Sequence, residues 1–251
     1  PIWPLPEMPQ GMSNKLHQLF DEEFNTWGFD VFELSRLSDK RPLLFGGWEA
    51  LLRSGCFAEF TISWEKVCAF LQQAEGLYMT EQQTPYHNNI HAADVAQTVH
   101  ALCYDLGIGR FFDPMDCFVA VLSAIVHDLG HDGRNNAYHV SVQDELALTY
   151  NDRSVLENYH LSLTFKMLVR DTSTNMLQGL SHALLAIVRR EVIDMVLGTD
   201  MSQHFARVGD FSRLVASLGR DAEAWQSEDS HMAVLRSMVL HSADISNPAK
   251  P

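Results

Sequence analysis

Histidine and aspartate residues gather at three places along this chain, in combinations that could bind metal ions. The first is residues 86–91 (YHNNIH), the second is the pair His127-Asp128, and the third is residues 241–244 (HSAD). Neutral imidazole nitrogens and carboxylate oxygens are ligands that suit zinc, manganese or magnesium. The residue types therefore indicate a divalent-metal site, and an aspartate has two oxygens with which to bridge two ions.

The charge of the chain bears on what such a site could act on. Lys and Arg total 18 against 32 Asp and Glu, which gives a net charge of −14. Nucleic-acid polymers are bound by clustered basic residues, so this balance argues against such a partner. An acidic chain that acts on a small anionic substrate needs bound cations, which divalent metals would supply.

The elements that must position these residues are predicted to be helices almost throughout. Apolar residues recur at helical spacing, and no alternating run of any length suggests a strand. Asp113-Pro114 is a helix start, because the carboxylate accepts free amide groups and proline fits the first turn. The expected elements are a helix from Ser13 to Trp27 stopped by Gly28, a loop over Arg41–Gly47, a helix opened by Ser63, a buried helix over Phe118–Val126 ended by Gly130 and Gly133, and helices over Val155–Arg170, His182–Leu197 and His231–Ala243.

Each cluster stands beside the end of an expected helix, where several side chains can be aimed at one point. Polar groups at the end of an apolar helix such as Phe118–Val126 cost free energy unless they are paired or bound to metal. The alternative is structural: a lone His-Asp pair is weak evidence, and Ser154-x-x-Glu157 is a capping box that would itself explain Glu157. The histidines expected to be structural are His100, His139, His182, His204 and His231.

Five segments resemble the class I cyclic-nucleotide phosphodiesterases, and they occur in the order found in that family. These segments are residues 86–95 (YHNNIHAADV), 127–136 (HDLGHDGRNN), 154–160 (SVLENYH), 199–201 (TDM) and 243–248 (ADISNP). The resemblance runs from about Trp27 to the end of the chain, with kinetoplastid members considered as closer relatives. It implies an all-α, compact multi-helix phosphodiesterase fold of the HD superfamily, with a dinuclear metal site at helix ends.

The resemblance also implies roles for individual residues. A first metal, usually zinc, would be held by His91, His127, Asp128 and Asp244. Asp128 would bridge to a second ion, usually magnesium or manganese. The water ligands of that second ion would be held by His131, Glu157 and Thr199. His87 would be the general acid, and substrate contacts are expected from Tyr86, Met201 and Asn247.

The implied reaction is hydrolysis of a 3′,5′-cyclic nucleotide to the 5′-monophosphate, with His87 giving a proton to the leaving 3′ oxygen. For that role His87 must be protonated near pH 7, so we expect an acidic neighbour to raise its pKa above about 6.5. The alternatives are that His87 is a fifth metal ligand or a simple loop histidine. Asn247 favours cAMP, since an amide can both accept from and donate to adenine. Dual specificity for cAMP and cGMP is the alternative, and Asn247-Pro248 could equally be only a turn.

The whole chain is expected to form a single catalytic domain, residues 1–251, with residues 1–12 as an N-terminal extension. Catalytic domains of the family continue through further helices that carry a glutamine and a phenylalanine for the purine. Because the sequence ends at Pro251, shortly after Asp244, we expect those helices to be absent. Oligomeric state and regulatory domains are left open.

Two other function classes and the cellular compartment complete these expectations. An HD-type phosphohydrolase acting on another nucleotide would share His127-Asp128 but not residues 87–95. A cyclic-nucleotide binding module without catalysis would have lost metal ligands, whereas all of them are present here.

No signal peptide and no apolar run of about 18 residues occurs, so we expect a cytoplasmic location and no transmembrane segment.

Overall fold

The computed structural model describes residues 10–250, apart from the side chains of residues 10–13 and 58. Within this part of the chain every regular element is a helix and none is a strand, so the predicted all-α class is confirmed. The α-helices are α1 (Gln10–Glu23), α2 (Val31–Leu37), α3 (Pro42–Arg53), α4 (Cys56–Glu59), α5 (Trp64–Leu77), α6 (Asn89–Tyr104), α7 (Pro114–Val126), α8 (Asn136–Val142), α9 (Glu145–Tyr150), α10 (Val155–Arg170), α11 (His182–Leu197), α12 (His204–Leu218), α13 (Ala222–Gln226) and α14 (Asp229–Asp244). The 3-10 helices are η1 (Ile108–Arg110), η2 (Met201–Gln203) and η3 (Asn247–Ala249).

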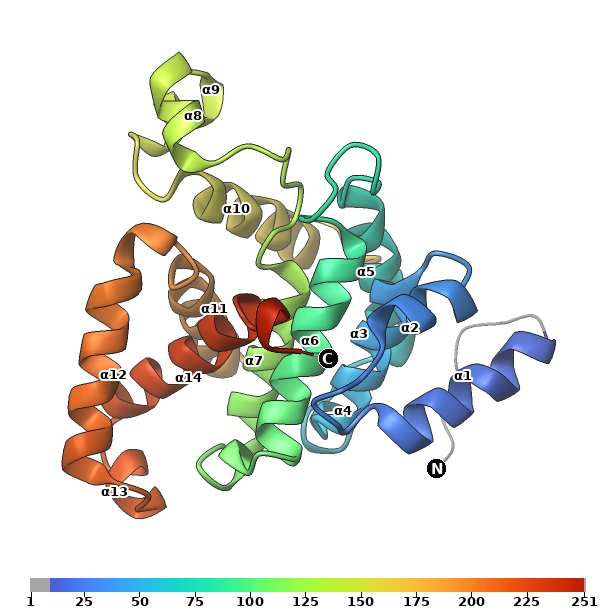
Figure 1. Cartoon of the computed structure of the whole chain (residues 1–251), viewed down its shortest axis with the longest axis horizontal. Coiled ribbons are helices and arrows are strands. Elements are labelled where there is room, and N and C mark those ends of the chain that lie inside the picture. The colour runs from blue at the N-terminus through green and yellow to red at the C-terminus, as the bar shows by residue number, and fades with distance from the viewer. Residues whose placement is uncertain (1–9, 251) are drawn as a thin grey trace.

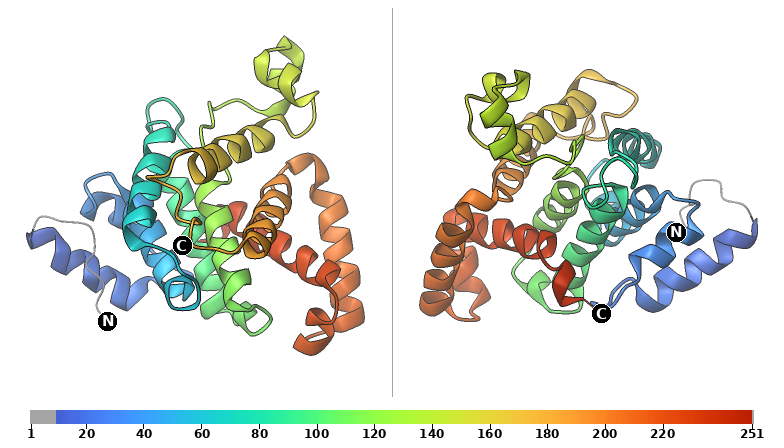
Figure 2. Two further views of the ribbon diagram at one scale, coloured as in Figure 1. Left: turned by 180° about the vertical axis from the view of Figure 1, so that it is seen from behind. Right: turned by 45° about the horizontal axis from the view of Figure 1, so that its top comes forward.

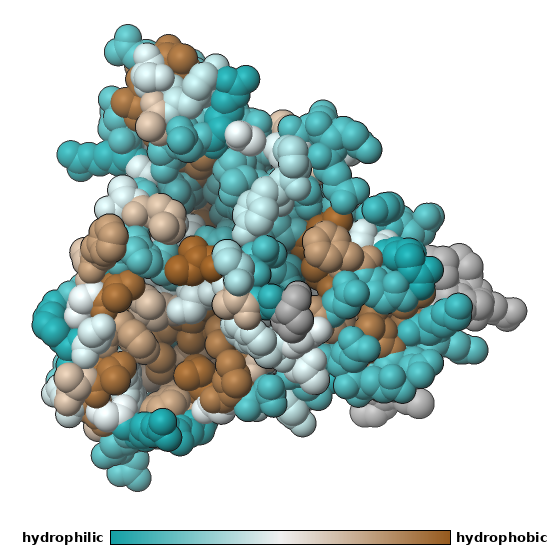
Figure 3. All heavy atoms as spheres, viewed as in Figure 1, coloured by the Kyte–Doolittle hydropathy of each residue, from teal (hydrophilic) through white to brown (hydrophobic). Residues whose placement is uncertain are grey.

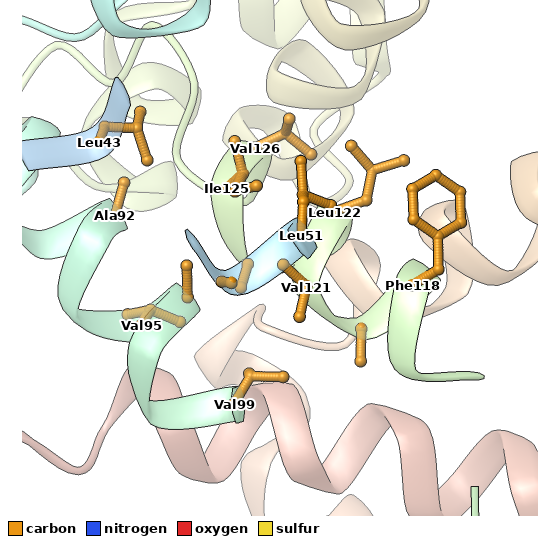
Figure 4. Packing of buried hydrophobic residues seen from close by; sticks show 14 of the residues in the cluster. Leu43, Leu51, Ala92, Val95, Val99, Phe118, Val121, Leu122, Ile125 and Val126 are labelled. Carbon is orange, nitrogen blue, oxygen red and sulfur yellow. The ribbon is translucent and has the colours of Figure 1, made fainter. Parts of the chain in front are cut away.

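The centre of the fold is formed by α6 and α7, with α3, α11 and α14 packed around them (Figures 1 and 2). Every residue from Phe118 to Val126 of α7 is buried, which confirms that this helix is central. Figure 4 shows Leu51 of α3, Val95 of α6 and Ile125 of α7 in this core. Each such buried side chain contributes about 1.5–3 kcal/mol. The helix that leads into the His127-Asp128 pair is therefore held on all sides.

Two helix starts follow the predicted capping chemistry. Ser63 opens α5 by accepting a hydrogen bond from the amide of Lys66 (3.4 Å). Asp113 accepts from the amide of Asp116 (2.8 Å), while Pro114 occupies the first turn of α7. The bounds predicted for α10 and α11 agree with the structure at both ends.

The loop predicted over Arg41–Gly47 is wrong, because α3 begins at Pro42. The carboxylate of Glu75 on α5 accepts hydrogen bonds from the amides of Leu43 and Leu44, both at 3.1 Å. These amides would otherwise be free donors at the helix start. The capping group thus belongs to another helix, about 30 residues further along the sequence, so the residues around Pro42 do not indicate it.

The two glycines of that predicted loop lie inside α3 because neighbouring helices approach closely there. A Cβ on Gly46 would lie 3.0 Å from a methyl group of Leu34, and one on Gly47 would lie 2.9 Å from a methyl group of Leu71. Both distances are shorter than ordinary van der Waals contact. The glycines therefore serve helix packing rather than a turn.

The first predicted helix, from Ser13 to Trp27, begins and ends earlier in the structure, where α1 spans Gln10–Glu23. Ser13 consequently lies within the helix and not at its N-terminus. After Glu23 the chain turns, and the amide of Thr26 donates to the carbonyl of Glu23 (2.8 Å). This turn ends the helix before Gly28 could act as its stop.

The end of α7 likewise precedes its predicted stop signals. The helix ends at Val126, and His127 is the C-cap residue. Gly130 and Gly133 follow in the loop with φ angles of 78° and 83°, a region that glycine adopts without strain. The loop that these glycines shape carries Asp128.

The alternative interpretation of Ser154-x-x-Glu157 as a capping box is wrong, because the side chain of Asn136 on α8 caps α10 instead. Ser154 has a left-handed backbone (φ 41°), and its hydroxyl donates to Asp200 (2.7 Å) instead of accepting from an amide. The Asn136 side chain accepts from the amide of Leu156 (2.9 Å) and donates to the Glu157 carboxylate (2.9 Å). Asn136 therefore both caps α10 and orients Glu157.

The surface in Figure 3 carries apolar side chains over the face formed by α12, α13 and α14. A hollow of about 590 Å³ on that face is lined by residues that include Tyr104, Leu106, Phe211, Val215 and Trp225. Between Gln10 and Lys250, no helix is both long and apolar enough to pass through a bilayer.

Candidate metal centre and active site

Four side chains that lie within or directly after three helices come together beside the core. The Nε2 atom of His91, in the first turn of α6, lies 3.0 Å from Asp244 Oδ1 at the end of α14 and 3.2 Å from His127 Nε2 after α7. His127 Nε2 lies 3.3 Å from the same Asp244 oxygen. Asp128 Oδ2 is 3.6 Å and 3.4 Å from the His91 and His127 nitrogens. The three clusters of the sequence thus form one cluster in space.

The spacing of these atoms fits a divalent ion. Two ligand atoms bound to one ion at roughly 2.0–2.2 Å, at angles between 90° and 109°, lie about 2.8–3.6 Å from each other. All five distances fall in that range. Among the described residues, His91, His127 and Asp244 form a group whose ligand atoms could share a metal ion. The site of the expected ligands is therefore suited to the metal that the sequence predicts.

The local hydrogen bonds orient the ligands as metal sites require. The Nδ1 atom of buried His127 donates to the carbonyl of Ala124 (2.8 Å), which leaves its Nε2 lone pair for the cluster. The Oδ2 atom of Asp128 is buried and, in the part of the chain described here, has no hydrogen-bond partner. A buried carboxylate oxygen without a hydrogen bond costs free energy, and a metal ion would satisfy it.

Without a metal, these groups stabilise one another as charges. Burial lowers the pKa of His127, but the charges of Asp128 and Asp244 outweigh it and raise that pKa to about 9. Burial raises the pKa of Asp244, whereas the neighbouring charge of His127 outweighs it and holds the pKa well below its usual range. An ion that entered would have to displace the His127 proton, so we expect metal affinity to rise with pH up to about 9.

A row of stacked imidazoles borders the cluster. The His87 ring stacks on His131 with centroids 4.0 Å apart, and His131 stacks on His160 at 5.7 Å. His131 Nδ1 accepts from the amide of Gly133 (2.9 Å), so its Nε2 carries the proton in the neutral ring. His160 has no role in the sequence-based prediction, yet its Nε2 lies 3.8 Å from Asp128 Oδ1. Its place at the end of the SVLENYH segment was the only signal for it.

The prediction that an acidic neighbour raises the pKa of His87 is wrong for the free site. Burial lowers this pKa below 6.5, and the charges of Asp128 and Asp244 offset the effect only in part. Electrostatic interaction with His91 and His127 lowers the pKa of His87 further. Acidic neighbours of His87 are thus present, but desolvation has the larger effect on its pKa.

The other two residues expected around a second ion, Glu157 and Thr199, each have a hydrogen-bond partner of their own. Glu157 receives both of its side-chain hydrogen bonds from Asn136 (3.2 and 2.9 Å). Burial raises the pKa of Glu157 to about 7 and outweighs that hydrogen bond. Thr199 is buried, and its hydroxyl donates to the carbonyl of Val196 (2.8 Å), which leaves oxygen lone pairs as acceptors.

Glu157→Gln should stabilise the metal-free protein at pH 8. The wild-type carboxyl has a folded-state pKa of about 7 against a reference of 4.5, so its ionisation costs stability as the pH rises through this window. The cost reaches at most about 3 kcal/mol above pH 7 and is absent below pH 4.5. Denaturant unfolding with a chelator at pH 8 and pH 5 measures it, with exposed Glu223→Gln as the control. An equal gain at both pH values would contradict a charge effect.

Two of the three expected substrate contacts share one cleft. Tyr86 and Asn247 line it together with His91 and Asp94. The Tyr86 ring packs against the His91 ring with centroids 4.6 Å apart. Met201 lies elsewhere, exposed on η2, and is not among the residues that line this cleft.

Comparison with known proteins decides the family. A profile described as 3′5′-cyclic nucleotide phosphodiesterase matches residues 86–251, more than half of the chain. The chain belongs to this family. The resemblance found in the five sequence segments is therefore confirmed, while the placement near kinetoplastid members stays a prediction.

Curated relatives and solved structures agree with membership of this phosphodiesterase family. The chain is 37% identical over 229 residues to the dual specificity calcium/calmodulin-dependent 3′,5′-cyclic nucleotide phosphodiesterase 1C of Mus musculus, covering 91% of the chain and 31% of the relative. It is 38% identical over 235 residues to the 3′,5′-cyclic-AMP phosphodiesterase 4C of Rattus norvegicus, covering 92% of the chain and 43% of the relative. The chain thus spans about a third to two fifths of the length of these relatives.

The fold is shared with solved phosphodiesterase structures. The phosphodiesterase domain of the RhoPDE fusion protein from the choanoflagellate Salpingoeca rosetta matches with a TM-score of 0.79 at 27% identity, covering 94% of this chain and 71% of that one. The structure of LmjPDEB1 in complex with IBMX matches with a TM-score of 0.82 at 27% identity, covering 98% and 73%. The predicted phosphodiesterase fold is confirmed, whereas the single-domain bounds 1–251 and the cytoplasmic location stay predictions.

Proposed function

We propose that this chain hydrolyses the phosphodiester of a 3′,5′-cyclic nucleotide and releases the nucleoside 5′-monophosphate. The observation that carries the proposal is the convergence of His91, His127 and Asp244, with ligand atoms within 3.3 Å of one another, in a member of a phosphodiesterase family. Family membership favours this function over an HD-type phosphohydrolase on another nucleotide. The adjacency of all the expected ligands favours it over a binding module that has lost catalysis.

The ligand atoms suit two divalent ions, which we assign as zinc and magnesium or manganese. His91, His127, Asp128 and Asp244 would hold the first ion. The second would share Asp128 and be held through water by His131, Glu157 and Thr199. When bound, such ions polarise the phosphate and acidify a water molecule, and they supply the positive charge that a chain of net charge −14 lacks.

We assign the role of general acid to His87. Its ring lies beside the cluster, with its centroid 5.9 Å from that of His91 and stacked on His131. The side chain borders the site without contributing one of the converging ligand atoms. A bound phosphodiester anion favours the imidazolium, which would offset the effect of burial on the pKa of His87.

For the base, we propose a preference for cAMP, with dual specificity as the alternative. Asn247 begins η3 and forms one wall of the cleft that also contains Tyr86 and His91. The volume of this cleft is about 70 Å³, well below the roughly 300 Å³ of the smallest typical small-molecule sites. The cleft would therefore hold only part of a nucleotide, and we expect Asn247 to contact one edge of the base. An amide there can pair with both the amino group and a ring nitrogen of adenine.

Turnover assays with cAMP and cGMP test the function and the preference together. The chain should release 5′-AMP with the larger kcat/KM, and a chelator should abolish the reaction until zinc and magnesium are restored. Asn247→Ala should narrow the gap between the two substrates by about 1–3 kcal/mol. Absence of metal-dependent turnover contradicts the function, whereas turnover with a preference for cGMP contradicts only the base assignment.

A further inference from the structure

A buried ion pair ties the last described residue of the chain to the helix that carries His91. Lys250 Nζ lies 2.5 Å from Asp94 Oδ1 and 2.5 Å from Thr98 Oγ1, both on α6. The Lys250 and Asp94 side chains are only 9% and 5% exposed. A charge pair so far from water is costly to form and strongly destabilising to break from one side. It is a specific contact and not a chance meeting of surface charges.

The segment between Asp244 and Lys250 is short and held at several points. Ser246 donates to the carbonyl of Ala243 (2.7 Å), and the amide of Lys250 donates to the carbonyl of Asn247 (3.2 Å). The indole of Trp27 donates to the carbonyl of Ala249 (3.2 Å). The segment can therefore transmit the position of its end to its beginning.

The two ends of this segment meet the same helix at neighbouring turns. Asp94 follows His91 by three residues on α6, and Lys250 follows Asp244 by six. The His91–Asp244 contact (3.0 Å) and the Asp94–Lys250 contact (2.5 Å) thus join α6 to both ends of the segment 244–250. Asn247 lies between these two contacts in the sequence and lines the same cleft as Asp94.

We propose that Lys250 is a positioning residue for the active site. By binding Asp94 and Thr98, its ammonium fixes the segment after α14 on α6, and this sets the Asp244 carboxylate and Asn247 relative to His91. The ammonium also neutralises Asp94, which would otherwise add a further carboxylate to a cleft that must receive an anion. Lys250 touches none of the converging ligand atoms itself. The kinetic part of this inference rests on the proposed function.

Lys250→Met tests the proposal, because it removes the ammonium and keeps the apolar stem. We expect zinc affinity, measured by chelator competition, to fall about 10–100-fold, the usual effect of residues that hold a ligand from outside. KM for the cyclic nucleotide should rise by a larger factor than kcat falls. Lys250→Arg should recover part of both losses, and exposed Lys166→Met on α10 is the matched control.

A double variant separates positioning from simple stabilisation. Asp94→Asn with Lys250→Met removes both charges, so unfolding stability should return toward wild type. Zinc affinity and KM should stay altered, because the double variant still lacks the link between α6 and the segment after α14. Recovery of all three quantities would reduce Lys250 to a partner in a stabilising ion pair and overturn the proposal. If Lys250→Met binds zinc as tightly as the wild-type chain, the positioning proposal is wrong, whatever the turnover. If the wild-type chain itself shows no turnover, only the proposed function is contradicted.

Discussion

Asp244→Ala should abolish cyclic-nucleotide turnover and empty the first metal site. The Asp244 oxygen lies 3.0 Å and 3.3 Å from the two histidine nitrogens, so its loss removes a direct ligand and not a supporting group. The fall in zinc affinity should exceed the about 10–100-fold that outer-shell changes cause. Metal content by mass spectrometry of the native protein, measured beside kcat, checks both effects.

A second effect of this substitution follows from charge. Asp244 and Asp128 together raise the pKa of His127 to about 9, so with one of them gone that pKa should fall. The exposed Asp210→Ala on α12 controls for the loss of one negative charge. Retention of stoichiometric zinc in Asp244→Ala would mean that the converging atoms do not form the metal site.

His87→Ala should keep both metals and lose about 10²–10⁴-fold in kcat, the usual contribution of general acid catalysis. The ring stacks on His131 and contributes none of the converging ligand atoms, so its removal should leave metal content unchanged. A substrate whose leaving group needs no proton should recover much of the loss. The exposed His182→Ala at the start of α11 is the matched control. A variant that sheds metal, or that is equally slow with the activated substrate, would show that His87 is not the acid.

The sequence predicts an element well where the element carries its own signals. The Asp113-Pro114 start of α7 was predicted correctly because its capping residues lie within the segment. The bounds of α10 and α11 were predicted correctly because apolar residues recur there at helical spacing. The loop over Arg41–Gly47 was wrong because the cap of α3 is the Glu75 carboxylate, which belongs to another helix.

In the candidate site, too, features with a signal in the local sequence were predicted and features that depend on the fold were not. The family resemblance singled out His91 and Asp244 as metal ligands, and the structure places their side chains 3.0 Å apart although 153 residues separate them in the sequence. The contacts of Asn136 with Glu157 and of Lys250 with Asp94 could not be predicted, because only the fold brings these side chains together. The predicted direction of the His87 pKa shift was wrong for a related reason. Burial lowers this pKa more than the neighbouring acids raise it, and the depth of burial cannot be inferred from adjacent residues.

Because 153 residues separate His91 from Asp244, the two side chains are synthesised at different times. At a synthesis rate of about 5–20 residues per second, roughly 8–30 s pass between the emergence of His91 and that of Asp244. During that interval α6 and α7 can pack, but the carboxylate that completes the ligand set does not yet exist. A metal ion at the proposed site would therefore bind fully only after α14 has packed against α6 and α7, so its binding would depend on contact between residues 153 positions apart.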